Sequence, residues 1–215
     1  MLAKVFSGAV SGVDAYAVEI EVNAGQGDPQ IVIVGLPDAA VKESKDRVHT
    51  AITNSGYKPH LGRVTVNLAP ADVKKEGPIF DLPIAVGMLV ASEEIKVSSL
   101  NDFALAGELA LSGEIRRVRG VLPIAMQALA DGRRGILVPV ENAEEAAVVE
   151  GLEVYPVKTL RQAADFLESR TGMTAFQVNL AACAAHPTDM EDDFADVKGQ
   201  EQAKRALEIA VASRN

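Results

Sequence analysis

A local basic cluster is the part of this sequence best suited to bind an anionic partner: Arg116, Arg117 and Arg119. Guanidinium groups bind phosphates and carboxylates through paired hydrogen bonds. A solvated strand face is nevertheless the commoner explanation of such a charge run. The net charge of -9 also argues against strong nucleic-acid binding by this chain alone, because phosphate contacts need a basic surface.

The loop around Gly77-Pro78 is the second place where chemistry could occur. Lys74 and Lys75 precede it and could meet an anion, although a surface role is favoured for both. Three acidic residues could converge on a groove beside this loop: Glu76, Asp81 and Glu108. Capping of the following helix explains Asp81 adequately.

Other common reaction types find little support in the sequence. The histidines at 49, 60 and 186 are far apart, and the chain has a single cysteine, so a metal site is not expected. Ser44 is expected on a solvated helix face beside two lysines. The chain has no Gly-Lys pair, which a phosphate-binding loop requires, and Gly25-Gln26-Gly27 is interpreted as a turn.

The pattern of apolar residues predicts a mixed α/β fold. Residues 16–22 and 63–68 alternate as half-buried strands, and residues 31–34 form a β-branched run suited to a sheet interior. Residues 105–118 predict a strand pair that turns at 112–113. Helices are expected to start at Asp38, Asp81, Asn142 and Thr159, and a further helix should follow Gly120.

The sequence predicts three regions: a domain at 1–170, a linker at 171–192, and the start of a second module at 193–215. Alanine, proline, threonine and acidic residues replace periodic patterns in the linker. Neither a signal peptide nor an apolar run of membrane-spanning length is recognisable, and one cysteine suits a reducing interior. A cytoplasmic protein without membrane contacts is therefore expected.

Three segments in this order and spacing resemble the Lon proteolytic domain, and more closely the N-terminal domain of the magnesium-chelatase-like AAA+ proteins of the ComM/YifB family. These segments lie at 74–85, 106–116 and 120–139, and the first contains Glu-Gly-Pro-Ile-Phe-Asp-Leu-Pro-Ile-Ala. The resemblance covers residues 1 to about 170. It implies a βαβ fold shared with Lon and with a ribosomal small-subunit protein domain.

The end of the chain resembles the opening of that family's ATPase module. Val197, Gly199 and Gln200 match the Val-Lys-Gly-Gln that lies upstream of the phosphate loop in the family. The resemblance implies that this chain is cut before that loop and has no cofactor of its own. It further implies that the full-length protein is a hexamer that uses ATP and Mg²⁺.

The resemblance to Lon permits a test of peptidase activity, residue by residue. Lon-type peptidases place a serine nucleophile directly after a Gly-Pro, and here that position is Ile79. Their lysine base follows a Leu-Pro-Ile by four residues, and counting from Leu122-Pro123-Ile124 gives Ala128. Neither side chain can attack a carbonyl or accept a proton. The resemblance therefore predicts a domain that has lost peptidase chemistry.

Three functions follow from these observations. The favoured one is a non-catalytic accessory domain of a hexameric DNA motor that promotes branch migration in recombination or natural transformation. In that case the arginine cluster is the best candidate for DNA or subunit contacts. The alternatives are an atypical or vestigial Ser-Lys peptidase, and the ATPase subunit of a metal chelatase.

Overall fold

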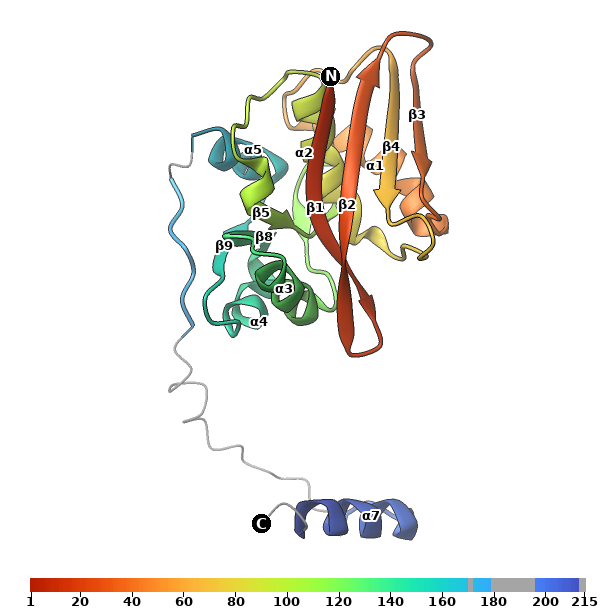
Figure 1. Cartoon of the computed structure of the whole chain (residues 1–215), viewed down its shortest axis with the longest axis vertical. Coiled ribbons are helices and arrows are strands. Elements are labelled where there is room, and N and C mark those ends of the chain that lie inside the picture. Colours follow the sequence, from red (N-terminus) through yellow and green to blue (C-terminus); the bar gives the residue numbers. More distant parts are fainter. Residues whose placement is uncertain (170–171, 179–195, 213–215) are drawn as a thin grey trace. The chain divides into compact units, whose positions relative to one another are not determined.

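The computed structural model describes residues 1–169, 172–178 and 196–212 (Figure 1). The chain divides into two compact units, Met1–Val178 and Asn179–Asn215. The first unit contains the central sheet and the packed core. The mixed α/β class predicted from the sequence is confirmed.

A seven-stranded sheet forms the centre of the first unit (Figure 1). Its order is β3-β4-β2-β1-β5-β8-β9. The strands are β1 (Leu2–Ser11), β2 (Asp14–Gly25), β3 (Gln30–Val34), β4 (Arg63–Ala69), β5 (Phe103–Leu105), β8 (Gly135–Pro139) and β9 (Glu153–Val157). β2 runs antiparallel to both neighbours, and the other adjacent pairs are parallel. Helical crossovers join the parallel pairs β3–β4, β5–β8 and β8–β9, whereas β1 and β5 lie far apart in the sequence.

Helices cover both faces of this sheet (Figure 1). The helices of the first unit are α1 (Ala39–Asn54), α2 (Asp81–Ala91), α3 (Val121–Ala130), α4 (Ala143–Ala147) and α5 (Leu160–Ser169). α2 packs on β1 and β2 and contacts α1 and α5. α3 packs on the opposite face, because a Cβ added at Gly8 would meet Ile124, whereas one at Gly87 would meet Val5 and Val22.

Short elements connect the helical layers to the sheet. A 3₁₀ turn, η1 (Pro78–Phe80), leads directly into α2. A small hairpin follows β5 and consists of β6 (Glu108–Leu109) and β7 (Ile115–Arg116). Two further 3₁₀ turns, η2 (Leu100–Asp102) and η3 (Val140–Asn142), precede β5 and α4. The predicted turn at 112–113 thus joins β6 to β7.

α2 is buried on every side. All of its eleven residues are buried, because the helix lies between the sheet and two other helices. A helix that is apolar on every side is typical of such a central position. Gly87 permits the close approach, since a Cβ there would come within 2.6 Å of a Val22 methyl group.

Local signals predicted the start of α1 correctly, but they did not predict the position of β3. The Asp38 side chain accepts a hydrogen bond from the Val41 N–H at 2.8 Å, as an N-cap should. β3 lies at the edge of the sheet with partly exposed residues, so its expected place in the sheet interior is wrong. A β-branched run indicates a strand but does not determine its neighbours.

The first unit extends beyond residue 170, where the sequence suggested its end. Met173 and Phe176 pack against the core, and the Phe176 N–H donates to the Val154 carbonyl at 2.7 Å. The remainder of the predicted linker, at 179–192, lies outside the described residues. In the second unit α7 (Glu201–Ala212) has no buried residue among those described.

Candidate functional site

A cavity of about 770 Å³ opens beside β1 in the first unit. Residues 9–11 at the end of β1 form its floor. One wall consists of Val73, Lys74 and residues 76–79 before α2, and the other consists of residues 117–120 before α3. The cavity therefore lies where loops from the two helical layers meet the edge of one strand.

The structure brings most of the predicted groove residues together. Glu76, Gly77, Pro78, Ile79 and Glu108 all line this cavity. Two residues of the arginine cluster, Arg117 and Arg119, line it as well. The two predicted sites, the Gly-Pro groove and the basic cluster, are therefore parts of one cavity.

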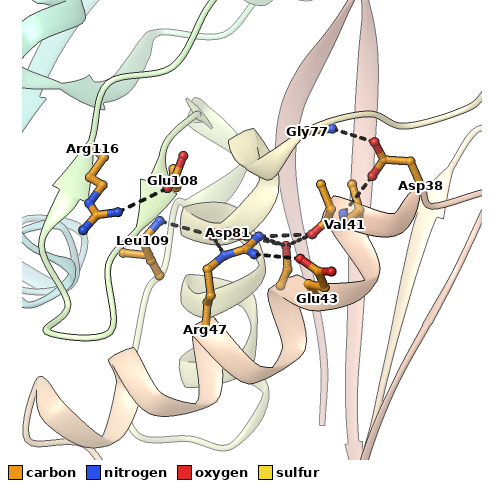
Figure 2. A network of polar contacts seen from close by, with 11 residues as sticks. Asp38, Val41, Glu43, Arg47, Gly77, Asp81, Glu108, Leu109 and Arg116 are labelled. Carbon is orange, nitrogen blue, oxygen red and sulfur yellow. Dashed lines mark hydrogen bonds and ion pairs between the residues drawn. The ribbon is translucent and has the colours of Figure 1, made fainter.

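Asp81 lies beneath the cavity and is not part of its lining. Its carboxylate is fully buried and accepts hydrogen bonds from Arg47 Nε at 2.8 Å and from the Leu109 N–H at 3.2 Å (Figure 2). Ser44 Oγ and Arg47 Nη2 donate to the other carboxylate oxygen. No side-chain hydrogen bond caps α2, so the explanation of Asp81 as a helix cap is wrong.

Ser44 is also placed differently from the prediction. Its side chain is buried at 0% exposure and lies between Asp81 and the Ala40 carbonyl. The predicted solvated position fails because α2 covers that side of α1. Arg47 was not singled out from the sequence, since an arginine between charged neighbours resembles any surface helix residue.

The Arg47–Asp81 pair neutralises the buried charge. The hydrogen bond that Arg47 donates to Asp81 raises the pKa of Arg47, and burial of the guanidinium opposes this shift. Figure 2 shows that Arg47 also reaches toward Glu43, at 3.9 Å. A buried ion pair with several hydrogen bonds holds its elements in place, and breaking it is costly. This cluster therefore positions η1 and β6 relative to α1, and it leaves no unpaired charge for chemistry.

The two lysines before the Gly-Pro step behave differently from each other. Lys74 is exposed and pairs with Glu76 at 2.7 Å, and this hydrogen bond raises its pKa. Lys75 is fully buried, which contradicts its expected surface role. Its ammonium donates to the carbonyls of Pro70 and Val73, and burial lowers its pKa. Lys75 thus closes the loop that forms one cavity wall.

The two positions compared with the Lon dyad do not meet in the structure. Ile79 lines the cavity, whereas Ala128 lies near the end of α3 and is not among the lining residues. The cavity meets α3 at its N-cap, Gly120, and eight helical residues span about 12 Å. The conclusion does not depend on which α3 residue is aligned with the Lon lysine, because α3 has the sequence VLPIAMQALA and contains no lysine.

The arginine cluster divides between a pair and two free cations. Arg116 lies 3.6 Å from Glu108 across the β6–β7 hairpin (Figure 2). Arg117 and Arg119 are exposed, and neither makes an ion pair or side-chain hydrogen bond with the described residues. Val118 between them is buried, whereas both arginine side chains are exposed and line the cavity.

Asn142 holds this segment in place and was not recognised as important from the sequence. Its buried amide accepts from the Val118 N–H at 3.0 Å and donates to the Val118 carbonyl at 2.8 Å. It makes no capping bond to α4, contrary to the prediction for this residue. Glu145 accepts from Asn142 and from the Leu122 N–H, which joins α4 to the start of α3.

The predicted start of the nucleotide module lies in the second unit. Val197, Gly199 and Gln200 directly precede α7, and the Gln200 carbonyl accepts from the Lys204 N–H at 3.0 Å. Gly199 and Gln200 both have positive φ, of 73° and 61°. This geometry forms a tight turn before the helix.

Among residues 1–169, 172–178 and 196–212, no three His, Cys, Asp or Glu side chains are grouped closely enough to hold a metal ion. The helices in these ranges are too short or too polar to cross a membrane.

Comparison with known proteins identifies the family. The family model described as subunit ChlI of Mg-chelatase matches residues 20–142. Salmonella typhimurium YifB, named as uncharacterized, is 44% identical over 211 residues, covering 98% of this chain and 41% of the relative. The competence protein ComM of Haemophilus influenzae is 41% identical over 215 residues, covering 100% of this chain and 42% of the relative.

A more distant similarity supports the relation to Lon. Lon protease 2 of Bacillus subtilis is 26% identical over 163 residues, covering 69% of this chain and 29% of the relative. The chain spans about two fifths of the length of the YifB and ComM relatives. It belongs to the ComM/YifB family of magnesium-chelatase-like AAA+ proteins.

Proposed function

We propose that this chain provides a non-catalytic accessory domain of a magnesium-chelatase-like AAA+ ATPase. The full-length protein would be a cytoplasmic hexamer that uses ATP and Mg²⁺ to move along DNA and to promote branch migration. The name of the competence protein relative supports a role with incoming DNA in natural transformation.

The observation that carries the accessory role is the chemistry of the cavity. The residue after Gly77-Pro78 is an isoleucine, and α3 offers no lysine to act as a base. The buried serine and aspartate nearby hydrogen-bond to each other and to Arg47, so neither is poised to attack a substrate. These contacts favour a binding or assembly role over peptide cleavage.

Arg117 and Arg119 in the cavity favour binding of an anionic partner. Arg117 and Arg119 are exposed on a segment fixed by Asn142, in a chain with net charge -9. In a ring of subunits such pairs would repeat and concentrate positive charge around a path for DNA.

The test is ATP hydrolysis by the full-length protein, with and without four-way DNA. We expect DNA to stimulate hydrolysis, and deletion of the first unit to weaken that stimulation. Arg117→Gln/Arg119→Gln should reduce the stimulation, whereas Lys42→Gln/Lys45→Gln removes two exposed charges from α1 and serves as the control. Indifference to DNA would contradict the motor role and favour the metal-chelatase alternative. Peptide cleavage by the first unit would contradict the accessory role.

A further inference from the structure

The edge of β1 is open where it borders the cavity. β1 continues to Ser11, but within the described residues its pairing with β5 is confined to Phe6 and Ala104. After β5 the chain turns away, and the Gly107 N–H donates to the Ile79 carbonyl at 3.0 Å. The last residues of β1 therefore have a strand neighbour on one side, where β2 pairs along their full length.

The register of the hairpin shows which backbone groups face this open edge. β1 and β2 are joined by the two residues Gly12 and Val13, and Ser11 pairs with Asp14. In such a hairpin the residue pair next to the turn is hydrogen-bonded, and hydrogen-bonded pairs then alternate with non-hydrogen-bonded pairs along the two strands. The N–H and C=O of Val10 therefore point away from β2. Phe6 lies four residues before Val10, so its N–H and C=O also point away from β2, toward β5, with which it pairs.

The cavity surrounds this edge from both faces of the sheet. Ala9 and Val10 both line it, although their side chains lie on opposite faces. Tyr16 pairs with Ala9 on the α2 face and donates to the Lys74 carbonyl at 2.9 Å, while Gly120 approaches Val10 on the α3 face. The two walls thus leave a space beside the strand rather than above it.

The charges in this space favour a carboxylate-bearing ligand. Lys74 is neutralised by Glu76, and Glu108 by Arg116. Arg117 and Arg119 also line the cavity and have no acidic partner in the described residues, and Asn142 fixes the backbone segment that carries them. Exposed guanidinium groups on a fixed backbone segment are suited to carboxylates.

We propose that this cavity binds an extended peptide with alternating acidic side chains, which adds a short strand to the open edge of β1. The peptide backbone would pair with the N–H and C=O of Val10, and its carboxylates would bind Arg117 and Arg119. Strand addition of this kind uses main-chain hydrogen bonds for affinity and side chains for selectivity. Because the cavity is lined by Ile79 at the position compared with the Lon serine, the peptide would be held and not cleaved.

The open strand edge, unlike the arginines, distinguishes a peptide from DNA. The strand edge presents a carbonyl acceptor as well as an N–H donor, and a phosphate backbone supplies acceptors but no donors. Part of the lining is also apolar, with Val10, Val73, Ile79 and Val118. Such surface suits the side chains of a half-buried strand.

The test measures binding of a synthetic hexapeptide, in which valine and glutamate alternate, to the full chain by fluorescence anisotropy. We expect saturable binding, and no saturable binding of the matched peptide with lysine in place of glutamate. Arg117→Gln/Arg119→Gln should weaken binding by roughly tenfold or more, as expected for lost charge-assisted hydrogen bonds. Lys42→Gln/Lys45→Gln should leave it unchanged.

A second set of variants tests the strand geometry and separates this proposal from DNA binding. Val10→Pro removes an N–H that faces away from β2, at a stretch of β1 without a second strand neighbour in the described residues, so no ladder bond is lost. It should abolish peptide binding, whereas Val10→Ala should retain it. N-methylation of alternate peptide amides should block binding in one of the two possible patterns and spare it in the other.

The outcomes decide the proposal independently of the DNA motor. If neither N-methylation pattern affects binding, strand addition to β1 is wrong. If the lysine peptide binds equally well, recognition of acidic side chains by Arg117 and Arg119 is wrong. If DNA-stimulated hydrolysis survives Val10→Pro while peptide binding is lost, the two activities are separate. Circular dichroism of Val10→Pro checks its fold, and the methylated peptides test the same contact on the unmodified protein.

Discussion

At the scale of single residues, Asp81 is the charge on which the cavity depends. Its carboxylate receives hydrogen bonds from α1 through Ser44 and Arg47, and from β6 through the Leu109 N–H. It stands at the first position of α2, directly after the η1 turn that forms part of the cavity wall. A single buried carboxylate therefore fixes three elements relative to one another.

Replacement of Arg47, the cationic partner of Asp81, should show how much free energy it costs to bury the Asp81 carboxylate without a counter-charge. We expect Arg47→Met to lower the free energy of unfolding by about 3 kcal/mol, because it leaves a buried carboxylate without a counter-charge. Arg116→Met breaks the exposed pair with Glu108 and should cost less than about 1 kcal/mol. Urea unfolding measures both. Equal losses would show that the Asp81 network contributes no more than a surface ion pair.

These residues also show what the sequence could not reveal. Ser44, Lys75 and Asp81 were predicted to be solvated or to cap a helix, and all three are fully buried. Ser44 and Asp81 are 37 positions apart along the chain, whereas Lys75 donates to carbonyls five and two positions before it, in a loop without periodicity. Local pattern detects neighbours within one or two turns, so it predicted the Asp38 cap but not these contacts.

At the scale of elements, the segment between β7 and α3 determines how the two free arginines are presented. Asn142, at the end of η3, binds both backbone groups of Val118. The sequence predicted both α3 and the start of α4, because their apolar and capping patterns are local. It did not predict that the two would be joined through Val118, since no spacing rule connects residues 24 positions apart.

We expect Asn142→Ala to destabilise the first unit by about 2–4 kcal/mol, because it leaves a buried N–H and a buried C=O without partners. Thr159→Ala removes a hydroxyl that caps α5 at 3.2 Å and should cost only about 1 kcal/mol. Thermal unfolding compares the two variants. If both lose the same stability, Asn142 acts as an ordinary helix cap and not as the anchor of the cavity wall.

At the scale of the whole molecule, the segment after α5 decides where the folded unit ends. The sequence placed this boundary at 170, where periodic patterns disappear. In the structure the chain returns across the edge of β9, with Phe176 bonded to Val154 and Gln162 Nε2 donating to the Met173 sulfur at 3.3 Å. A segment of a few residues carries no periodicity, so its packing could not be predicted from pattern.

Two truncations test this boundary. A chain that ends at Val178 should unfold at the same urea concentration as residues 1–215, because the core of the first unit remains complete. A chain that ends at residue 170 loses Met173 and Phe176, and its free energy of unfolding should fall by about 1–3 kcal/mol. Phe176→Ala in the full chain should reproduce most of that loss. Equal stability of the two truncated chains would mean that the returning segment covers β9 without stabilising it, and the functional unit could then end at 170.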